Sequence, residues 1–153
     1  MYRNFIKYWL PVTFWMGVIF LMSTGTFSSE HTSRFIVPVL HFLFPWLSQQ
    51  DVDMIHGMTR KAGHVTEYFI LGLLFFRAFR GESPQAWRLR WAIYAFIGVV
   101  FYAVTDEFHQ SLVAVRTASL VDVGIDSTSG ILSQIAVMLW QRRCGRVSSY
   151  FLL

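Results

Sequence analysis

Long apolar stretches separated by short polar ones run through most of the chain. A helix needs about 20 residues to cross the hydrocarbon core of a bilayer, and four of the stretches approach that length. We therefore predict four transmembrane helices, at approximately 5–22, 62–79, 91–110 and 120–140. No internal repeat, linker or second domain is visible. The pattern predicts a single all-α domain over 1–153, that is, a polytopic membrane protein.

The connection after the first predicted helix, 23–61, is too long for a simple turn. Its segment SRFIVPVLHFLFPWLS is apolar, but it is too short to span a bilayer and is interrupted by Pro38 and Pro45. We expect it to form an interfacial or re-entrant segment. Ser48 then has the character of a helix N-cap, with Asp51 in the first turn of the helix that follows.

The low content of charged residues supports the membrane class. Only 14% of the residues are charged and 54% are hydrophobic, whereas an average soluble domain has about 25% charged residues. The single cysteine, Cys144, excludes an intrachain disulfide and a zinc site built on several thiolates. The net charge of +4 comes from scattered residues with no recognisable nucleic-acid-binding module. Membrane lipids are therefore the expected partners and nucleic acid is not, while the oligomeric state stays open.

The basic residues are distributed unevenly about the four predicted helices. Nine of the thirteen lie on the side of the two termini, namely Arg3, Lys7, Arg77, Arg80, Arg88, Arg90, Arg142, Arg143 and Arg146. The other four are Arg34, Arg60, Lys61 and Arg116. Because cytoplasmic loops are enriched in Lys and Arg, we predict a multi-pass protein of the cytoplasmic (inner) membrane with both termini in the cytoplasm. The alternative for the N-terminus is a cleaved signal peptide, although the STG at 23–25 matches a cleavage site poorly.

Polar residues gather where three of the predicted helices approach the outer boundary. The richest segment is TDEFHQSLVAVRTASLVDVGIDS, at 105–127, which lies between two apolar stretches. At 1.5 Å per residue, the third helix continues to about residue 110 before it leaves the membrane, so the acids of this segment begin inside a helix. In chain order, the polar residues of the three helices are Lys61, His64, Glu67, Asp106, Glu107, His109, Gln110, Asp122 and Asp126.

These groups are costly in a bilayer if each faces lipid alone. A single Asp at the centre of a transmembrane helix costs about 2.5–3.5 kcal/mol on insertion scales, and less near the interface. Most of that penalty disappears if the carboxylates pair with Lys61, Arg116 and the two histidines around a wet cavity. We therefore expect one cavity that opens to the outside. Taken singly, each residue also fits a plainer role as a helix cap, a headgroup anchor or a packing residue.

Two segments, RKAGHVTEYFILGLLF and TDEFHQSLVAVRTASLVDVGIDSTSG, resemble the VanZ-like family of membrane proteins. The family pattern places a lysine, a histidine and a glutamate or tyrosine at the start of one span, followed later by D-E-x-H-Q, an arginine and two aspartates four residues apart. The matching residues are Lys61, His64, Glu67, Asp106, Glu107, His109, Gln110, Arg116, Asp122 and Asp126. The resemblance implies a cell-envelope protein, since the founding member is associated with resistance to teicoplanin, a lipoglycopeptide antibiotic.

Three functions fit the predicted site. The first is an enzyme that acts on a lipid-linked or phosphate-bearing envelope substrate, with a histidine as general acid or base. Its candidate catalytic residues are His64, Glu67, Asp106, Glu107, His109, Asp122 and Asp126, and its candidate substrate-binding residues are Lys61, Gln110 and Arg116. A divalent metal is an alternative cofactor, because these side chains include enough nitrogen and oxygen donors. The other two functions are a non-catalytic protein that binds or shields a ligand and, less favoured, a small transporter.

Overall fold

A computed structural model of the chain describes residues 2–24, 29–85, 87–112 and 119–150. These residues form five helices and no strand, so the expected all-α fold is confirmed. In chain order, the helices are α1 (Tyr2–Met22), α2 (Ser29–Leu43), α3 (Gln49–Arg80), α4 (Leu89–Ser111) and α5 (Leu120–Tyr150).

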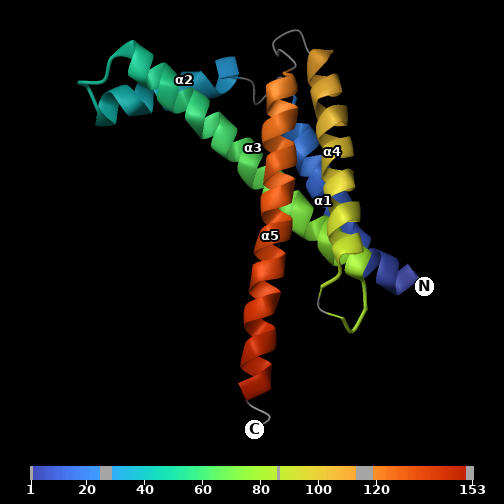
Figure 1. Cartoon of the computed structure of the whole chain (residues 1–153). Helices are drawn as coiled ribbons and strands as arrows, with labels where there is room; N and C mark the ends of the chain where they lie inside the picture. The colour runs from blue at the N-terminus through green and yellow to red at the C-terminus, as the bar shows by residue number, and fades with distance from the viewer. Residues whose placement is uncertain (1, 25–28, 86, 113–118, 151–153) are drawn as a thin grey trace.

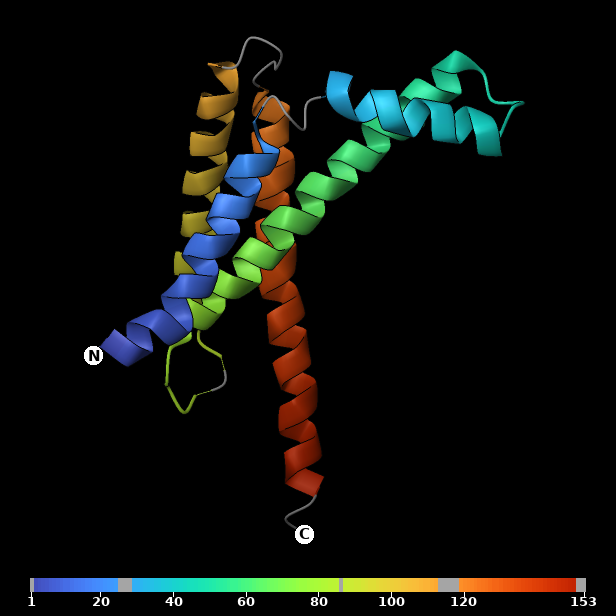
Figure 2. The same cartoon turned by 180° about the vertical axis from the view of Figure 1, so that it is seen from behind.

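The helices α3, α4 and α5 pack against one another, and α1 packs on α3 (Figures 1 and 2). The start of α1, the end of α5 and the connection from α3 to α4 lie at one end of the bundle. The end of α4 and the start of α5 lie at the opposite end, and the first half of α3 projects away from the bundle there. We call this the α2 end, because α2 lies alongside the projecting half of α3.

The core of the bundle depends on small residues at helix crossings. Gly72 of α3 lies against Ser133 of α5, and a Cβ at residue 72 would lie only 2.1 Å from the Ser133 hydroxyl. Gly130 likewise faces Val99 of α4 at distances that leave no room for a side chain. Close approach of backbones at small residues is characteristic of helix packing in membranes. The crossing at Gly72 fixes how closely α3 and α5 approach each other.

Within the described part of the chain, two helices are long and apolar enough to cross a membrane, Arg3–Met22 and Leu89–Ser111. Large apolar side chains also cover the outside of the bundle; Phe101 and Phe14 are 74% and 69% exposed. The predicted second and fourth spans lie within α3 and α5, whose apolar runs are interrupted by polar residues such as Glu67 and Asp122. By length and composition, therefore, two of the four predicted spans qualify as membrane-spanning helices.

Two of the helices are longer than the spans predicted within them. α3 begins at Gln49, well before the predicted start at residue 62, and α5 continues to Tyr150. The predicted N-cap is confirmed: the backbone N–H of Asp51 donates to the Ser48 hydroxyl at 3.2 Å, and the Asp51 carboxylate accepts from the Ser48 backbone N–H at 3.2 Å. This reciprocal capping box satisfies two backbone donors that the helix leaves unpaired. The apolar segment that follows α1 forms α2, with Pro38 inside the helix.

Candidate functional site

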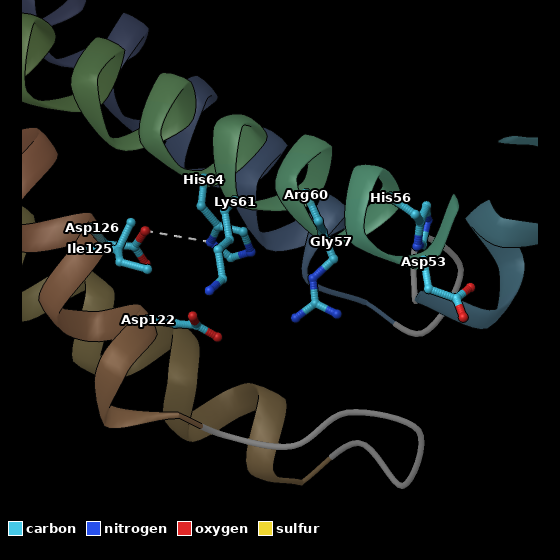
Figure 3. Close-up of a pocket in the computed structure, with 9 residues that line it drawn as sticks. All are labelled: Asp53, His56, Gly57, Arg60, Lys61, His64, Asp122, Ile125 and Asp126. Carbon is cyan, nitrogen blue, oxygen red and sulfur yellow. Dashed lines mark ion pairs between the residues drawn. The ribbon is translucent and has the colours of Figure 1, made fainter. Parts of the chain in front are cut away.

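A cavity of about 260 Å³ lies between α3 and α5, where the first half of α3 leaves the bundle (Figure 3). Residues of α3 and α5 that recur every three or four positions line it, because such residues share one face of a helix. The lining residues are Asp53, His56, Gly57, Arg60, Lys61 and His64 of α3, and Asp122, Ile125 and Asp126 of α5. We call this space the α3–α5 cavity.

A histidine and an aspartate face each other in the α3–α5 cavity. The Nδ1 atom of His64 lies 3.5 Å from an Oδ1 atom of Asp126, whose side chain is completely buried. The His64 ring is also parallel to the ring of Tyr68, one turn further along α3. A carboxylate at Nδ1 favours a proton on that nitrogen, which leaves Nε2 as the acceptor. This arrangement is suited to a general base.

Two cations accompany this pair. Arg60 and Lys61 extend from α3 into the same space, and Asp122 faces them from the first turn of α5 (Figure 3). Asp53 lies at the far end of the row, beside His56. The cavity thus combines anion-binding groups with carboxylates that accept hydrogen bonds. Such a mixed lining suits a headgroup that carries both a negative charge and hydroxyl or amino groups.

A second polar group is buried beside the cavity, at the end of α4. Gln110 donates a hydrogen bond of 2.9 Å to Asp106 and lies 3.5 Å from the Ser23 hydroxyl, which follows α1. Glu107 accepts a hydrogen bond of 2.8 Å from the backbone N–H of Ser119, just before α5. These contacts join the ends of α1, α4 and α5. They position the helices rather than line the cavity.

The two polar groups are electrostatically connected. Asp106 of α4 and Asp126 of α5 both interact with Tyr68, a completely buried residue of α3. Glu107 interacts with both of these aspartates and with Asp122. Within the described residues, neither Oδ2 of Asp126 nor Oδ1 of Asp106 has a hydrogen-bond partner. Since Asp126 lines the cavity, that oxygen can accept a hydrogen bond from a group bound there.

The remaining predicted site residues lie elsewhere. Glu67 interacts with His64 and Tyr102 but does not line the cavity. The ring of His109 packs on Phe20 of α1, with 4.4 Å between ring centroids. Arg116 is outside the described residues. The structure therefore brings four of the ten predicted residues into the cavity, namely Lys61, His64, Asp122 and Asp126.

Of the lining residues with polar side chains, Asp53, His56 and Arg60 were not among the predicted site residues. In the sequence, Arg60 fits the pattern of a headgroup anchor, while neither His56 nor Asp53 fits a particular role. The signal that identifies them is helical spacing, since residues 53, 56, 60 and 64 follow one another at intervals of three or four along α3. Extending the helix back to the Ser48 cap would have placed all of them on the face of His64.

The potential metal ligands among the described residues are spread over the site. No group of three or more His, Cys, Asp or Glu side chains there is arranged to hold a metal ion. The pair His64–Asp126 and the hydrogen-bonded pair Asp106–Gln110 belong to different helix interfaces. The pair His64–Asp126 is the part of the cavity for which the structure gives a direct contact between two titratable side chains.

The fold and the site together define a class: helical proteins with apolar, membrane-type helices and a polar cavity at one end of the bundle. Residues 8–141 match the family model described as VanZ/LLP1. The match covers most of the chain, which therefore belongs to the VanZ/LLP1 family. No curated protein and no solved structure gave a significant match. The resemblance in the sequence is confirmed, and the family and the two apolar helices together indicate a membrane protein.

Proposed function

We propose that this protein binds the headgroup of a phosphate-bearing, lipid-linked envelope substrate in the α3–α5 cavity. In this proposal α1, α3, α4 and α5 cross the cytoplasmic membrane, both termini are cytoplasmic and the cavity faces outward. The arrangement of the helices supports such a topology, because the start of α1, the end of α5 and the α3–α4 connection share one end of the bundle. That end also carries most of the basic residues, as cytoplasmic ends do.

One observation carries the proposal: Arg60 and Lys61 line the same cavity as the pair His64–Asp126. A guanidinium offers a planar fork of donors that matches two phosphate oxygens, and an ammonium adds a second positive charge. Asp122, across the cavity, is placed to accept hydrogen bonds from hydroxyl or amino groups of the same headgroup. The cavity therefore provides both attraction for a phosphate and selectivity for what is attached to it.

His64 is then the group that exchanges a proton with the bound substrate. Asp126 holds Nδ1 of the imidazole, so Nε2 can accept a proton from a hydroxyl or a water at the headgroup. The carboxylates of Glu67 and Asp122 also interact electrostatically with His64. Asp106, Glu107 and Gln110 act as positioning residues, since they join the helix ends that hold Asp126 in place.

Binding is tested with purified protein in detergent, by native mass spectrometry with two added lipids of identical chains. Dioleoyl phosphatidic acid carries a phosphate monoester, and dioleoyl phosphatidylcholine carries a zwitterionic headgroup. We expect a preference for phosphatidic acid that falls by about tenfold or more in the double variant Arg60→Ala/Lys61→Ala, since hydrogen bonds to charged groups are strong. The matched control is Arg88→Ala/Arg90→Ala, which removes two cations at the opposite end of the bundle. Equal binding of the two lipids by the unaltered protein would overturn the proposal.

Proton transfer is tested by comparing the lipids of cells with and without the protein. We expect at least one lipid species to differ between these cells. Cells that carry His64→Gln at normal abundance should have the lipids of cells without the protein. Identical lipid profiles would show that the cavity binds without catalysing a reaction.

The same site is proposed to connect this protein with lipoglycopeptide resistance. A protein that modifies or occupies lipid-linked envelope molecules alters what such an antibiotic meets at the outer surface. The support is membership of the VanZ/LLP1 family. We expect expression to raise the inhibitory concentration of teicoplanin and Arg60→Ala/Lys61→Ala to abolish the rise; an unchanged inhibitory concentration on expression would contradict this role.

A further inference from the structure

An apolar groove of about 470 Å³ continues from the α3–α5 cavity along the outside of α5. The two spaces share Ile125, and Val65 of the groove directly follows His64 of the cavity. From there the groove runs past Gly124 to Leu132, toward the middle of the bundle. The polar and apolar spaces are therefore two parts of one continuous surface.

The floor of the groove is apolar in effect, although hydroxyl groups contribute to it. The Thr128 hydroxyl donates a hydrogen bond of 2.8 Å to the backbone carbonyl of Gly124, and the Ser129 hydroxyl donates one of 2.9 Å to that of Ile125. Because their own helix satisfies these donors, neither hydroxyl needs a partner in the groove. Gly124 adds depth, since no atom lies within 4 Å of the position that its Cβ would take.

The groove also has the length of one lipid chain. Val121 and Leu132 are eleven steps apart along α5, which is about 16 Å at 1.5 Å per residue and roughly half of a hydrocarbon core of about 30 Å. One end of the groove meets the polar cavity, and the other end lies nearer the middle of the bundle. A lipid in one leaflet likewise has a polar headgroup at one end and a hydrocarbon chain that extends over about half of the hydrocarbon core.

We propose that this groove binds a hydrocarbon chain of the substrate whose headgroup occupies the α3–α5 cavity. The inference rests on the function proposed above and narrows it to a substrate that enters from within the bilayer. The headgroup reaches Arg60 and Lys61 while its chain stays against α5. A second apolar depression, between α4 and α5, does not fit this role. It includes Trp87 and Leu89, near the opposite end of the bundle, and no polar cavity residue lines it.

The test fills the groove with Gly124→Leu. A leucine is a strong helix former and has open space at this position, so the variant should fold. Its matched control is Gly17→Leu in α1, where the Cβ position is equally unobstructed but the residue lies outside the groove. The probes are two lipids, dioleoyl and dihexanoyl phosphatidic acid, which share a headgroup and differ in chain length. Retention by the purified protein is measured by native mass spectrometry.

We expect Gly124→Leu to weaken retention of the dioleoyl lipid by about tenfold, as loss of apolar contact along one chain predicts. Retention of the dihexanoyl lipid should fall much less, because its short chains have little contact with the groove to lose. A photoreactive group at mid-chain of phosphatidic acid should label 121–132 of α5, and Gly124→Leu should remove that label.

The two proposals fail in different ways. If Gly124→Leu and Gly17→Leu retain the dioleoyl lipid equally, or if the label is not on α5, the chain-binding groove is wrong even where phosphatidic acid is preferred. If the unaltered protein retains dioleoyl phosphatidic acid and dioleoyl phosphatidylcholine equally and Gly124→Leu weakens retention of both, the groove stands and the phosphate-binding role of the cavity is wrong.

Discussion

The crossing of α3 and α5 at Gly72 gives the sharpest prediction about stability. In Gly72→Ala the new Cβ would lie 2.1 Å from the hydroxyl oxygen and 3.1 Å from the Cβ of Ser133. Non-bonded heavy atoms are most favourably separated by about 3.5–4.0 Å. Either the Ser133 side chain must rotate or the two helices must move apart. Both responses have a calculable cost.

Rotation of Ser133 breaks its 2.7 Å hydrogen bond to the backbone carbonyl of Gly130 and leaves a buried hydroxyl unpaired, which costs about 1–3 kcal/mol. Separating the helices instead is an overpacking strain of about 1–3 kcal/mol. Alanine offsets part of either cost, because it is more favourable than glycine in a helix by about 1 kcal/mol. We therefore expect Gly72→Ala to lower the free energy of unfolding by about 1–2 kcal/mol.

The assay is equilibrium unfolding in mixed detergent micelles, followed by circular dichroism, on a double-mutant cycle. Ser133→Ala removes the oxygen that lies at 2.1 Å and leaves contacts of 3.1 Å to the Cβ of residue 133 and 3.3 Å to Nε2 of Gln134, so Gly72→Ala should be nearly neutral in that background. The coupling energy should be about 1–2 kcal/mol. Gly124→Ala, with no atom within 4 Å of the new Cβ, is the control and should not destabilise the protein. Additive effects of Gly72→Ala and Ser133→Ala would refute the proposed clash.

Four further predictions follow from single contacts. Asp126→Asn keeps the shape of the side chain but loses the charge that orients His64, so phosphatidic acid should still bind while any lipid difference in cells disappears; loss of both would contradict the separate roles. Tyr102→Phe removes a hydrogen bond of 2.5 Å to the Met16 carbonyl and should cost about 0.5–1.5 kcal/mol of unfolding free energy, whereas the half-exposed Tyr94→Phe control should cost less. Cys144 should resist a membrane-impermeant thiol reagent in intact cells and react after permeabilisation, and ready labelling of intact cells would reverse the proposed topology. Arg116, outside the described residues, is expected to grip an anionic headgroup, so Arg116→Lys should insert normally but lose function because lysine lacks the bidentate geometry; a fully active variant would leave it only a counter-ion role.

The sequence pattern predicts the helices better than their limits. Apolar runs identified α1 and α4 almost residue for residue, because a long apolar run makes up most of each helix. The predicted span at 62–79 covers only the second half of α3, which begins at Gln49, because the first half of this helix is polar and has no membrane-like composition. The Ser48 cap was visible from the sequence, but a cap shows where a helix starts and not how far it continues.

The candidate site shows a similar division. Helical spacing in a single helix predicts which residues share a face, as for Asp122 and Asp126 of α5. It does not predict which faces of different helices meet, because that depends on helix rotation and crossing. His109 shows the consequence: it lies two residues after the buried Glu107, and its ring packs on Phe20 of α1 instead of joining the cavity.

The position of the cavity follows from how α3 is divided. In its second half, apolar side chains and Gly72 allow close packing on α5. Its first half is rich in polar residues and diverges from α5 toward α2 (Figures 1 and 2). His64 and Asp126 lie close to the point where this divergence begins, so the last contact between the two helices is polar and the space beyond it is open. Two helices that cross closely at one point and separate beyond it form a cleft without any specialised loop. Asp122 and Asp126, which are costly to expose to lipid, line that cleft, where the proposed headgroup would reach them while its chain follows α5.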